Sequence, residues 1–272
     1  MTEYESVSRA IRSCLVDEVY NLAAQSHVGE SFNCPIYTQD VNGNGVLRIL
    51  EVLRGSKIRL YQASTSEMFG GSSAPQNERT PFDPRSPYAA SKVFAHHSCG
   101  VYRQAYGVRV SCGILFNHES PMRGKDFVTR KITWNLANRG EVDLGNLSSK
   151  RDWGHAKDYM EAAWMMLQHD PDDFVIGTGE SHSVNEFLIE AISIIGGQAK
   201  VRQELVRPLD VPELRADFTK ALMTLGWEPK TSFRELVREM CEAEVQGSDN
   251  RSRREVGMDM AGQGQDPMVS RR

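Results

Sequence analysis

The chain of 272 residues has no cysteine pair at metal-ligand spacing and no long apolar run. Its five cysteines are odd in number and far apart: Cys14, Cys34, Cys99, Cys112 and Cys241. Without a Cys-x-x-Cys pair they predict reduced thiols and no zinc or other metal site. No stretch of 18 apolar residues occurs, and acidic residues 1–5 do not resemble a signal peptide. We therefore expect a cytoplasmic protein without a membrane-spanning helix.

A strong charge of one sign is also missing. Lys and Arg number 32 and Asp and Glu number 36, which gives a formal net charge of −4. This balance argues against the basic surface of a nucleic-acid-binding protein, although a few local arginines can still hold a phosphate. With 40% hydrophobic and 25% charged residues, the chain can form one large globular domain or two small ones.

The sequence does contain short apolar segments that alternate with amphipathic ones. Helices are predicted at 5–16, 35–54, 87–105, 127–138, 155–169, 184–195, 219–225 and 232–245, and strands at 18–24, 58–64, 108–116 and 174–177. This order predicts the α/β class, with a Rossmann-like, doubly wound parallel sheet covered by helices on both faces. Residues 247–272 are polar and aperiodic, which predicts a disordered tail.

Three of the predicted strands end in polar residues, at 23–27, 64–67 and 117–120. In parallel sheets, ligands bind beyond the carboxyl ends of the strands. A turn or a helix cap explains any one of these segments alone. Three of them in one sheet favour a binding site.

A Tyr-x-x-x-Lys pair, Tyr88 and Lys92, lies in the first turns of the predicted helix 87–105. The spacing puts both side chains on one helical face, where a lysine lowers the pKa of a tyrosine toward the range of a general base. The pattern alone is common on solvated faces, but Thr65 and Glu67 just upstream add a hydroxyl and a carboxylate. A base alone cannot oxidise an alcohol, so we expect a hydride acceptor, usually a nicotinamide.

Six long runs surround these residues and are far more specific than Tyr-x-x-x-Lys. They are NLAAQSH (21–27), YQASTSE (61–67), PRSPYA (84–89), GILFNHESP (113–121), FVTRKI (127–132) and RDWGHAKDY (151–159). With these runs the chain resembles the GDP-mannose 4,6-dehydratases, a family of the extended short-chain dehydrogenase/reductases. The resemblance covers about residues 5–245.

The resemblance implies a role for each of the four side chains. Tyr88 would take the proton from the mannose 4-hydroxyl while hydride passes to NADP, and Thr65 would hydrogen-bond O4. Glu67 would remove the C5 proton and help to expel the 6-hydroxyl as water, before hydride returns to C6. Lys92 would tune Tyr88 and hold the nicotinamide ribose. The products would be GDP-4-dehydro-6-deoxymannose and water, in a first step towards GDP-fucose-type sugars.

The same resemblance implies two sets of binding residues and a homodimer or homotetramer. NADP would contact Leu22, Ala23, Ala24, Gln25, Ser26, Tyr37, Lys92, His118 and Arg123. GDP-mannose would contact Asn117, Val128, Lys131, Arg151 and Arg207. Arginine suits a diphosphate because it forms bidentate hydrogen bonds, although an ordinary surface ion pair is the alternative for Lys131 and Arg207. His96 and His97 receive no role.

The chain departs from the superfamily pattern at its start. The superfamily opens with a strand, a glycine-rich turn and a helix that binds the pyrophosphate. No such run precedes Glu18, and Gly43 and Gly45 lie inside a helical pattern. About 60–80 residues, three strands and two helices, are expected to be missing, which leaves the Glu18 strand as an exposed edge. The expected domains are a partial dinucleotide-binding domain (1–125) and a nucleotide-sugar-binding region (126–246).

Three interpretations stay open from the sequence. The first is an active dehydratase, and the second is an impaired fragment or a non-catalytic interaction subunit of the same family. The third is another nucleotide-sugar dehydratase or epimerase. Thr65 together with Glu67 favours dehydration, because epimerisation alone needs no base at C5.

Overall fold

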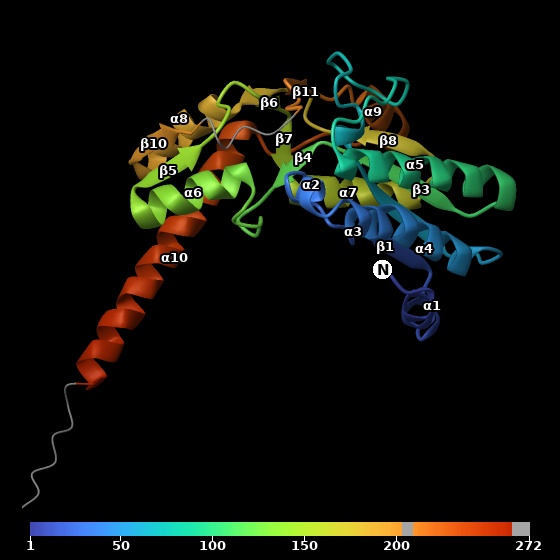
Figure 1. Ribbon diagram of the computed structural model, residues 1–272, viewed down its shortest axis with the longest axis horizontal. Coiled ribbons are helices and arrows are strands. Elements are labelled where there is room, and N and C mark those ends of the chain that lie inside the picture. Colours follow the sequence, from blue (N-terminus) through green and yellow to red (C-terminus); the bar gives the residue numbers. More distant parts are fainter. Residues whose placement is uncertain (203–208, 263–272) are drawn as a thin grey trace, which may run out of the picture.

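A computed structural model describes residues 1–202 and 209–262, with side chains placed as far as residue 247. At its centre lies a parallel sheet with the strand order β1-β2-β3-β8 (Figure 1). The strands are Glu18–Asn21 (β1), Arg59–Thr65 (β2), Val110–Leu115 (β3) and Asp173–Ile176 (β8). Every residue of β3 is buried, as expected for an inner strand between helices. The predicted α/β, Rossmann-like class is confirmed.

Helices from the first part of the chain cover one face of this sheet. They are α1 (Tyr4–Arg12), α2 (Glu30–Asn33), α3 (Pro35–Gln39), the π-helical turn η1 (Asp40–Asn44), α4 (Gly45–Leu53) and α5 (Pro87–Tyr106). Leu50 and Leu53 of α4 pack with Leu60 of β2 in the core on this side. α3, η1 and α4 follow one another directly, so the predicted helix from residue 35 is confirmed and has a wider turn in its middle.

The start of α5 is fixed by its cap. The Ser86 hydroxyl accepts a hydrogen bond of 3.0 Å from the Ala89 N–H, and Pro87 occupies the first turn, where no N–H is needed. Gly107 ends the helix with a φ of 66°, a left-handed conformation that glycine adopts without strain. Tyr88 is therefore the second residue of a long helix with a defined beginning.

The opposite face of the sheet is covered by α7 (Ala156–Leu167) and α9 (Thr219–Leu225). Tyr61 of β2, Tyr159 of α7 and Trp227 share a core there. β8, α7 and α9 all lie beyond residue 125 in the chain. The predicted regions 1–125 and 126–246 therefore share this sheet, because a crossover connection returns the chain to pair β8 with β3.

The other elements form a second region beside the sheet (Figure 1). Its helices are α6 (Val128–Arg139), α8 (Val184–Ile195) and α10 (Phe233–Gly262). Its short strands pair as β4 (Asn117–Glu119) with β7 (Trp153–His155), β5 (Glu141–Leu144) with β10 (Gln198–Val201), and β6 (Lys150–Arg151) with β9 (His182–Ser183) and β11 (Glu213–Leu214). Ile132, Phe187 and Leu236, one from each helix, pack in a common core.

The far end of α10 differs from the sequence-based expectation. A disordered tail was predicted from residue 247, whereas the helix continues to Gly262 and extends away from the body in Figure 1. The structure corrects the prediction as far as Gly262, and residues 263–272 lie outside the described part. Once the first turns of a helix are packed, each further residue adds one hydrogen bond without a new nucleation cost, which explains why a polar segment can stay helical.

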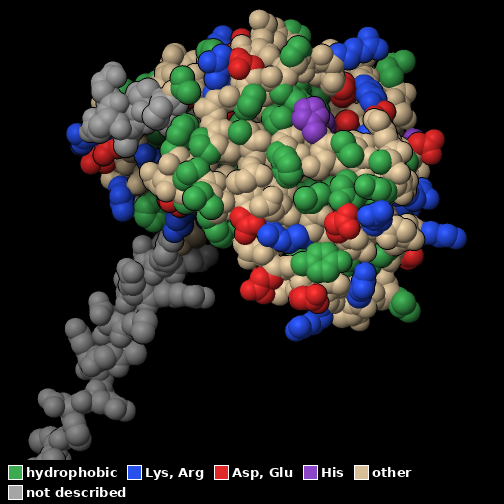
Figure 2. Space-filling model, turned by 45° about the vertical axis from the view of Figure 1, so that its right-hand side comes forward, with side chains coloured by type: hydrophobic (Ala, Val, Ile, Leu, Met, Phe, Trp, Pro, Cys, Tyr) green, Lys and Arg blue, Asp and Glu red, His purple; other side chains and the backbone are tan. Residues whose placement is uncertain are grey.

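The surface has no dominant charge on the face that Figure 2 shows. Separate Lys and Arg side chains alternate there with Asp and Glu side chains, and hydrophobic side chains are spread among them. Among the described helices, none combines the length and the apolar character that crossing a membrane requires. β1 forms one edge of the four-stranded sheet, as predicted for the Glu18 strand.

A glycine in β3 provides a test of the packing of this sheet. A Cβ at Gly113 would collide with the ring and hydroxyl of the buried Tyr61, whereas a Cβ at Gly100 in α5 would meet nothing within 4 Å. We expect Gly113→Ala to lower the free energy of unfolding by about 1–3 kcal/mol because of overpacking. Gly100→Ala, the control, should raise it by about 0.5–1 kcal/mol through helix propensity. Urea unfolding of both variants measures this, and an unchanged Gly113→Ala stability would contradict the packing described here.

Candidate active site

A cavity of about 720 Å³ opens where the carboxyl ends of β1, β2 and β3 meet the second region. Residues that follow the three strands line its floor: Leu22, Ala24, Ser26, Thr65, Glu67, Asn117 and His118. Residues of the second region line the opposite side, among them Val128, Lys131, Arg151 and Asp210. The three polar strand ends therefore converge on one cavity, as predicted from the sequence.

The four predicted catalytic side chains all line this cavity. Thr65 is the last residue of β2, and Glu67 lies in the 3₁₀ turn η2 (Ser66–Met68) that follows. The Thr65 hydroxyl accepts from the Glu67 N–H at 3.3 Å and also hydrogen-bonds the Tyr88 hydroxyl. The strand end and the helix start thus meet through a hydroxyl pair, with a carboxylate one turn away.

Lys92 is almost fully buried below this pair, with 4% of its surface exposed. Its ammonium donates a hydrogen bond of 3.0 Å to the Ala63 carbonyl oxygen of β2. Burial lowers the pKa of Lys92 from 10.5 to about 8, because a charged group is poorly solvated inside a protein. The side chain nevertheless remains mostly cationic at neutral pH.

Burial has the largest effect on the pKa of Tyr88. Burial raises the pKa of Tyr88 to about 12, although the Thr65 hydrogen bond and Arg123 lower it and Glu67 raises it further. The Lys92 ammonium lies 5.9 Å from the centre of the Tyr88 ring and is not among the causes of the shift. Desolvation outweighs the cationic neighbours, so the phenol is protonated at neutral pH in the protein alone.

Arg151 places a buried positive charge on the opposite side of the cavity. Its guanidinium donates to the Val211 carbonyl oxygen at 2.8 Å, which anchors it in the second region. Its nitrogens lie 3.9 Å from a carboxylate oxygen of Glu67 and 3.6 Å from one of Asp210. The cavity therefore contains a fixed guanidinium between two carboxylates.

His118 and Arg123 occupy the rim between α5 and α6. Burial lowers the pKa of His118 to about 4, so the ring is neutral, and its Nδ1 donates to the Phe116 carbonyl oxygen at 2.9 Å. Nε2 is left as a hydrogen-bond acceptor. The Arg123 guanidinium lies 3.6 Å from the centre of the Phe127 ring and forms an ion pair of 3.1 Å with Glu119.

Most of the predicted binding residues line the cavity, but not all. Leu22, Ala24, Ser26, Lys92, His118 and Arg123 do so from the cofactor set, and Asn117, Val128, Lys131 and Arg151 from the substrate set. Ala23 and Gln25 are not lining residues, and Tyr37 on α3 is more than half exposed and lies outside the cavity. Arg207 lies outside the described residues.

Among the lining residues that the sequence analysis did not assign are Asn146, Ser149 and Asp210. The Asp210 carboxylate accepts hydrogen bonds from the Ser149 hydroxyl at 2.5 Å and the Asn146 amide at 2.9 Å. These residues lie in loops without periodicity and are about 60 positions apart, so no local pattern indicates the contact. Trp153, within the RDWGHAKDY run, also lines the cavity.

The donor set on the β1 side fits the nicotinamide half of NADP. The wall there is formed by the small or apolar residues Leu22, Ala24 and Ala63, which accept a flat ring without displacing charged groups. Lys92 uses one donor on Ala63, and its ammonium has two further N–H groups for ribose hydroxyls.

A parallel α/β sheet with a Tyr-x-x-x-Lys helix at its carboxyl edge defines the class of the protein. It is an extended short-chain dehydrogenase/reductase of the NAD(P)-dependent epimerase/dehydratase type. The family model of GDP-mannose 4,6 dehydratase matches residues 1–240. The chain belongs to the GDP-mannose 4,6 dehydratase family.

Relatives and a solved structure agree with this assignment. GDP-mannose 4,6 dehydratase 1 of Arabidopsis thaliana is 47% identical over 262 residues, which cover 90% of this chain and 73% of the relative. The Homo sapiens GDP-mannose 4,6 dehydratase is 45% identical over 278 residues, covering 90% of this chain and 75% of the relative. The Thermus thermophilus UDP-glucose 4-epimerase, solved in complex with NAD, superposes with a TM-score of 0.83 at 28% identity and covers 89% of this chain and 82% of its own.

The buried ammonium of Lys92 predicts a pH dependence of stability. Its pKa is about 8 in the folded chain and 10.5 without burial, so between these values the unfolded state binds more protons. The free energy of unfolding of the wild-type chain should therefore rise with pH across this window, by an amount on the order of 3 kcal/mol from Lys92. Lys92→Met should lack this increase, while the exposed Lys57→Met should keep it. Urea unfolding at several pH values measures this dependence. If the free energy of unfolding changed equally with pH in both variants, the Lys92 ammonium would not be a buried charge.

Proposed function

We propose that the chain catalyses the GDP-mannose 4,6-dehydratase reaction, with NADP as its cofactor. One observation carries the proposal: a single cavity brings Thr65, Glu67, Tyr88 and Lys92 together in a chain of this family. The reaction converts GDP-mannose to GDP-4-dehydro-6-deoxymannose and water. It needs a proton acceptor at the C4 hydroxyl and a separate base at C5, and the cavity offers a phenol and a carboxylate for these positions.

The four side chains have distinct roles in this proposal. NADP held beside Leu22, Ala24 and Lys92 would supply the hydride chemistry that the oxidation at C4 and the reduction at C6 need. Tyr88 takes the proton from the C4 hydroxyl, and Thr65 holds O4 through the hydroxyl that also contacts Tyr88. Glu67 removes the C5 proton, which the C4 carbonyl has made acidic, and assists the loss of the C6 hydroxyl as water. Lys92 orients the ribose and supplies positive charge near Tyr88.

The binding roles follow from the two sides of the cavity. Leu22, Ala24 and Ser26 after β1 contact the nicotinamide half, together with the neutral His118 and with Arg123 at the rim. The nucleotide sugar is held from the second region by Val128, Lys131 and Arg151, and Asn117 lies between the two. Cofactor binding is thus assigned to the sheet and sugar-nucleotide binding to residues of the region 126–246.

A homodimer is proposed from an apolar surface on α3 and α5, two helices that pack against each other. Ile36 on α3 is 86% exposed, and Phe94 and Val101 on α5 are 42% and 58% exposed. Burial of such side chains against a second copy would remove apolar surface from water. Light scattering of the purified chain should give the dimer mass, and Ile36→Asp should shift it to the monomer mass. A wild-type chain that is monomeric at micromolar concentration would contradict the proposal.

The cytoplasm is the compartment that the cysteines favour. All five are free thiols in the structure, and thiols persist in a reducing compartment. Fluorescence microscopy of a tagged chain can test this assignment.

A second candidate function is that of a non-catalytic family member. The observation in its favour is that β1 is an edge strand of the sheet, with no glycine-rich turn beside it among the described residues. Saturable binding of NADP, followed by fluorescence, separates the two candidates. Comparison of GDP-mannose with dTDP-glucose as substrates separates the proposed reaction from that of another dehydratase.

The role of Glu67 is tested by Glu67→Gln, which removes the base and keeps the shape of the side chain. Release of the 4-keto-6-deoxy product should fall by at least about 10²-fold, the usual contribution of a positioned general base. NADP affinity should stay the same, because Glu67 is assigned to the sugar. Glu180→Gln, at a side chain that is 77% exposed, is the matched control.

Each outcome of this experiment has a distinct meaning. Near-normal product release by Glu67→Gln would show that another group removes the C5 proton. Absence of saturable NADP binding by the wild-type chain at millimolar cofactor would instead contradict the enzymatic function of the chain as it stands.

A further inference from the structure

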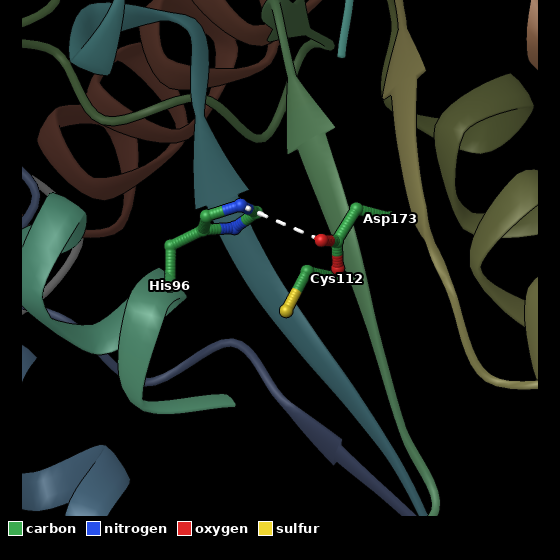
Figure 3. Close-up of side chains that lie close together, drawn as sticks. All are labelled: His96, Cys112 and Asp173. Atoms are coloured by element: carbon green, nitrogen blue, oxygen red, sulfur yellow. Dashed lines mark ion pairs between the residues drawn. The ribbon is translucent and has the colours of Figure 1, made fainter. Parts of the chain in front are cut away.

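A second cluster of reactive side chains lies behind the active site, between α5 and the sheet. His96 comes from α5, Cys112 from β3 and Asp173 from the first position of β8 (Figure 3). The imidazole, thiol and carboxylate ligand atoms all lie within 4.8 Å of one another. None of the three residues lines the cavity, so the proposed dehydratase reaction does not use them.

A second thiol, that of Cys99, lies next to this cluster. It is fully buried on α5 and hydrogen-bonds the equally buried thiol of Cys112. His96 and Cys99 are three positions apart on α5, a spacing that places both side chains on the face toward the sheet. One imidazole, one thiol and one carboxylate therefore meet, with the Cys99 thiol beside them, although their positions in the sequence range from 96 to 173.

The groups around the cluster already orient the ligand atoms as a metal would require. The Ser64 hydroxyl of β2 lies 3.1 Å from Nδ1 of His96, which leaves Nε2 directed at Asp173. Arg103 donates to Oδ1 of Asp173 at 2.5 Å, which leaves Oδ2 facing Nε2 of His96 at 3.6 Å. Outer partners of this kind fix the ring tautomer and the carboxylate of metal ligands.

We propose that His96 Nε2, Cys112 Sγ and Asp173 Oδ2 hold a divalent cation of the zinc type, with a solvent molecule completing a tetrahedral site. Zinc accepts nitrogen, sulfur and oxygen ligands in such a set, whereas calcium and magnesium take oxygen ligands only. On binding, the Cys112 thiol releases its proton to solvent and forms a metal–thiolate bond, so no oxidant or reductant is needed.

The fit of the site follows from its size and its access. Ligand bonds of about 2.0–2.3 Å to zinc imply ligand–ligand separations of about 3.3–3.8 Å. The present separations of up to 4.8 Å thus require side-chain movements on the order of 1 Å rather than backbone rearrangement. The Asp173 side chain is 25% exposed, and it offers a path from solvent to the buried thiols.

A metal here would link three elements on which the active site depends. His96 follows Lys92 by one turn on α5, and Ser64 directly precedes Thr65 on β2. The cation would therefore hold α5 against β3 and β8 without touching a substrate. Its function in this proposal is structural.

The test uses the whole chain, purified without a histidine tag and then exposed to zinc alone. Elemental analysis after dialysis should find about one zinc per chain. Cobalt added to the wild-type chain should give thiolate charge-transfer absorbance together with the d–d bands of a tetrahedral ion, and zinc should abolish them. Zinc should also raise the melting temperature of the wild-type chain.

Variants then assign the metal to this cluster. Cys112→Ser and Asp173→Asn should lower the zinc content to below a tenth of the wild-type value. Two control substitutions should keep it: Cys241→Ser, at a buried thiol in another core, and Cys14→Ser, at an exposed thiol. The cobalt spectrum is measured on the wild-type chain. It therefore tests for a tetrahedral metal site even if the Cys112→Ser variant does not fold.

Three results would overturn the proposal. The first is a wild-type chain that binds no zinc and gives no tetrahedral cobalt spectrum at micromolar metal, which would leave the cluster as a hydrogen-bonded part of the core. The second is a folded Cys112→Ser chain with full zinc content. The third is loss of zinc in Cys14→Ser, which would reveal an adventitious surface site.

Discussion

The hydrogen bond from the Lys92 ammonium to the Ala63 carbonyl oxygen joins α5 to β2 in the interior of the protein. A buried charge without a partner is costly, so this contact fixes how the helix lies on the strand. The helix start with Tyr88 and the strand end with Thr65 and Glu67 keep their mutual position as a result. The relative positions of Thr65, Glu67 and Tyr88 therefore depend on Lys92, although burial destabilises its charged form.

The active site is divided between two kinds of structure. The sheet and α5 supply the acid–base groups and the nicotinamide side, and their positions are set by backbone pairing and by helix packing. The second region supplies Arg151 and Asp210. The Val211 carbonyl oxygen and the carboxylates of Glu67 and Asp210 hold Arg151 in place. Ser149 and Asn146 donate hydrogen bonds to Asp210. Because the chain crosses between the regions several times, neither forms the cavity alone.

The sequence predicts what short-range patterns encode. Helix 184–195 was predicted with its observed bounds, and the polar strand ends at Thr65 and Asn117 indicated the cavity, because strand period and strand direction fix where such residues meet. It could not predict the pKa of Tyr88, which burial by distant residues determines. It also missed the cluster of His96, Cys112 and Asp173, since a search for local cysteine spacing cannot find ligands from a helix and two strands.

The strand β2 connects two clusters by adjacent residues: the Ser64 hydroxyl contacts His96, and the Thr65 hydroxyl contacts Tyr88. Because side chains alternate along a strand, the insertion or deletion of one residue before Ser64 would move both hydroxyls away from their partners at once. Substitutions can alter either position separately, but a change in length cannot. The length of this segment is therefore under a stricter constraint than the identity of any one of its residues.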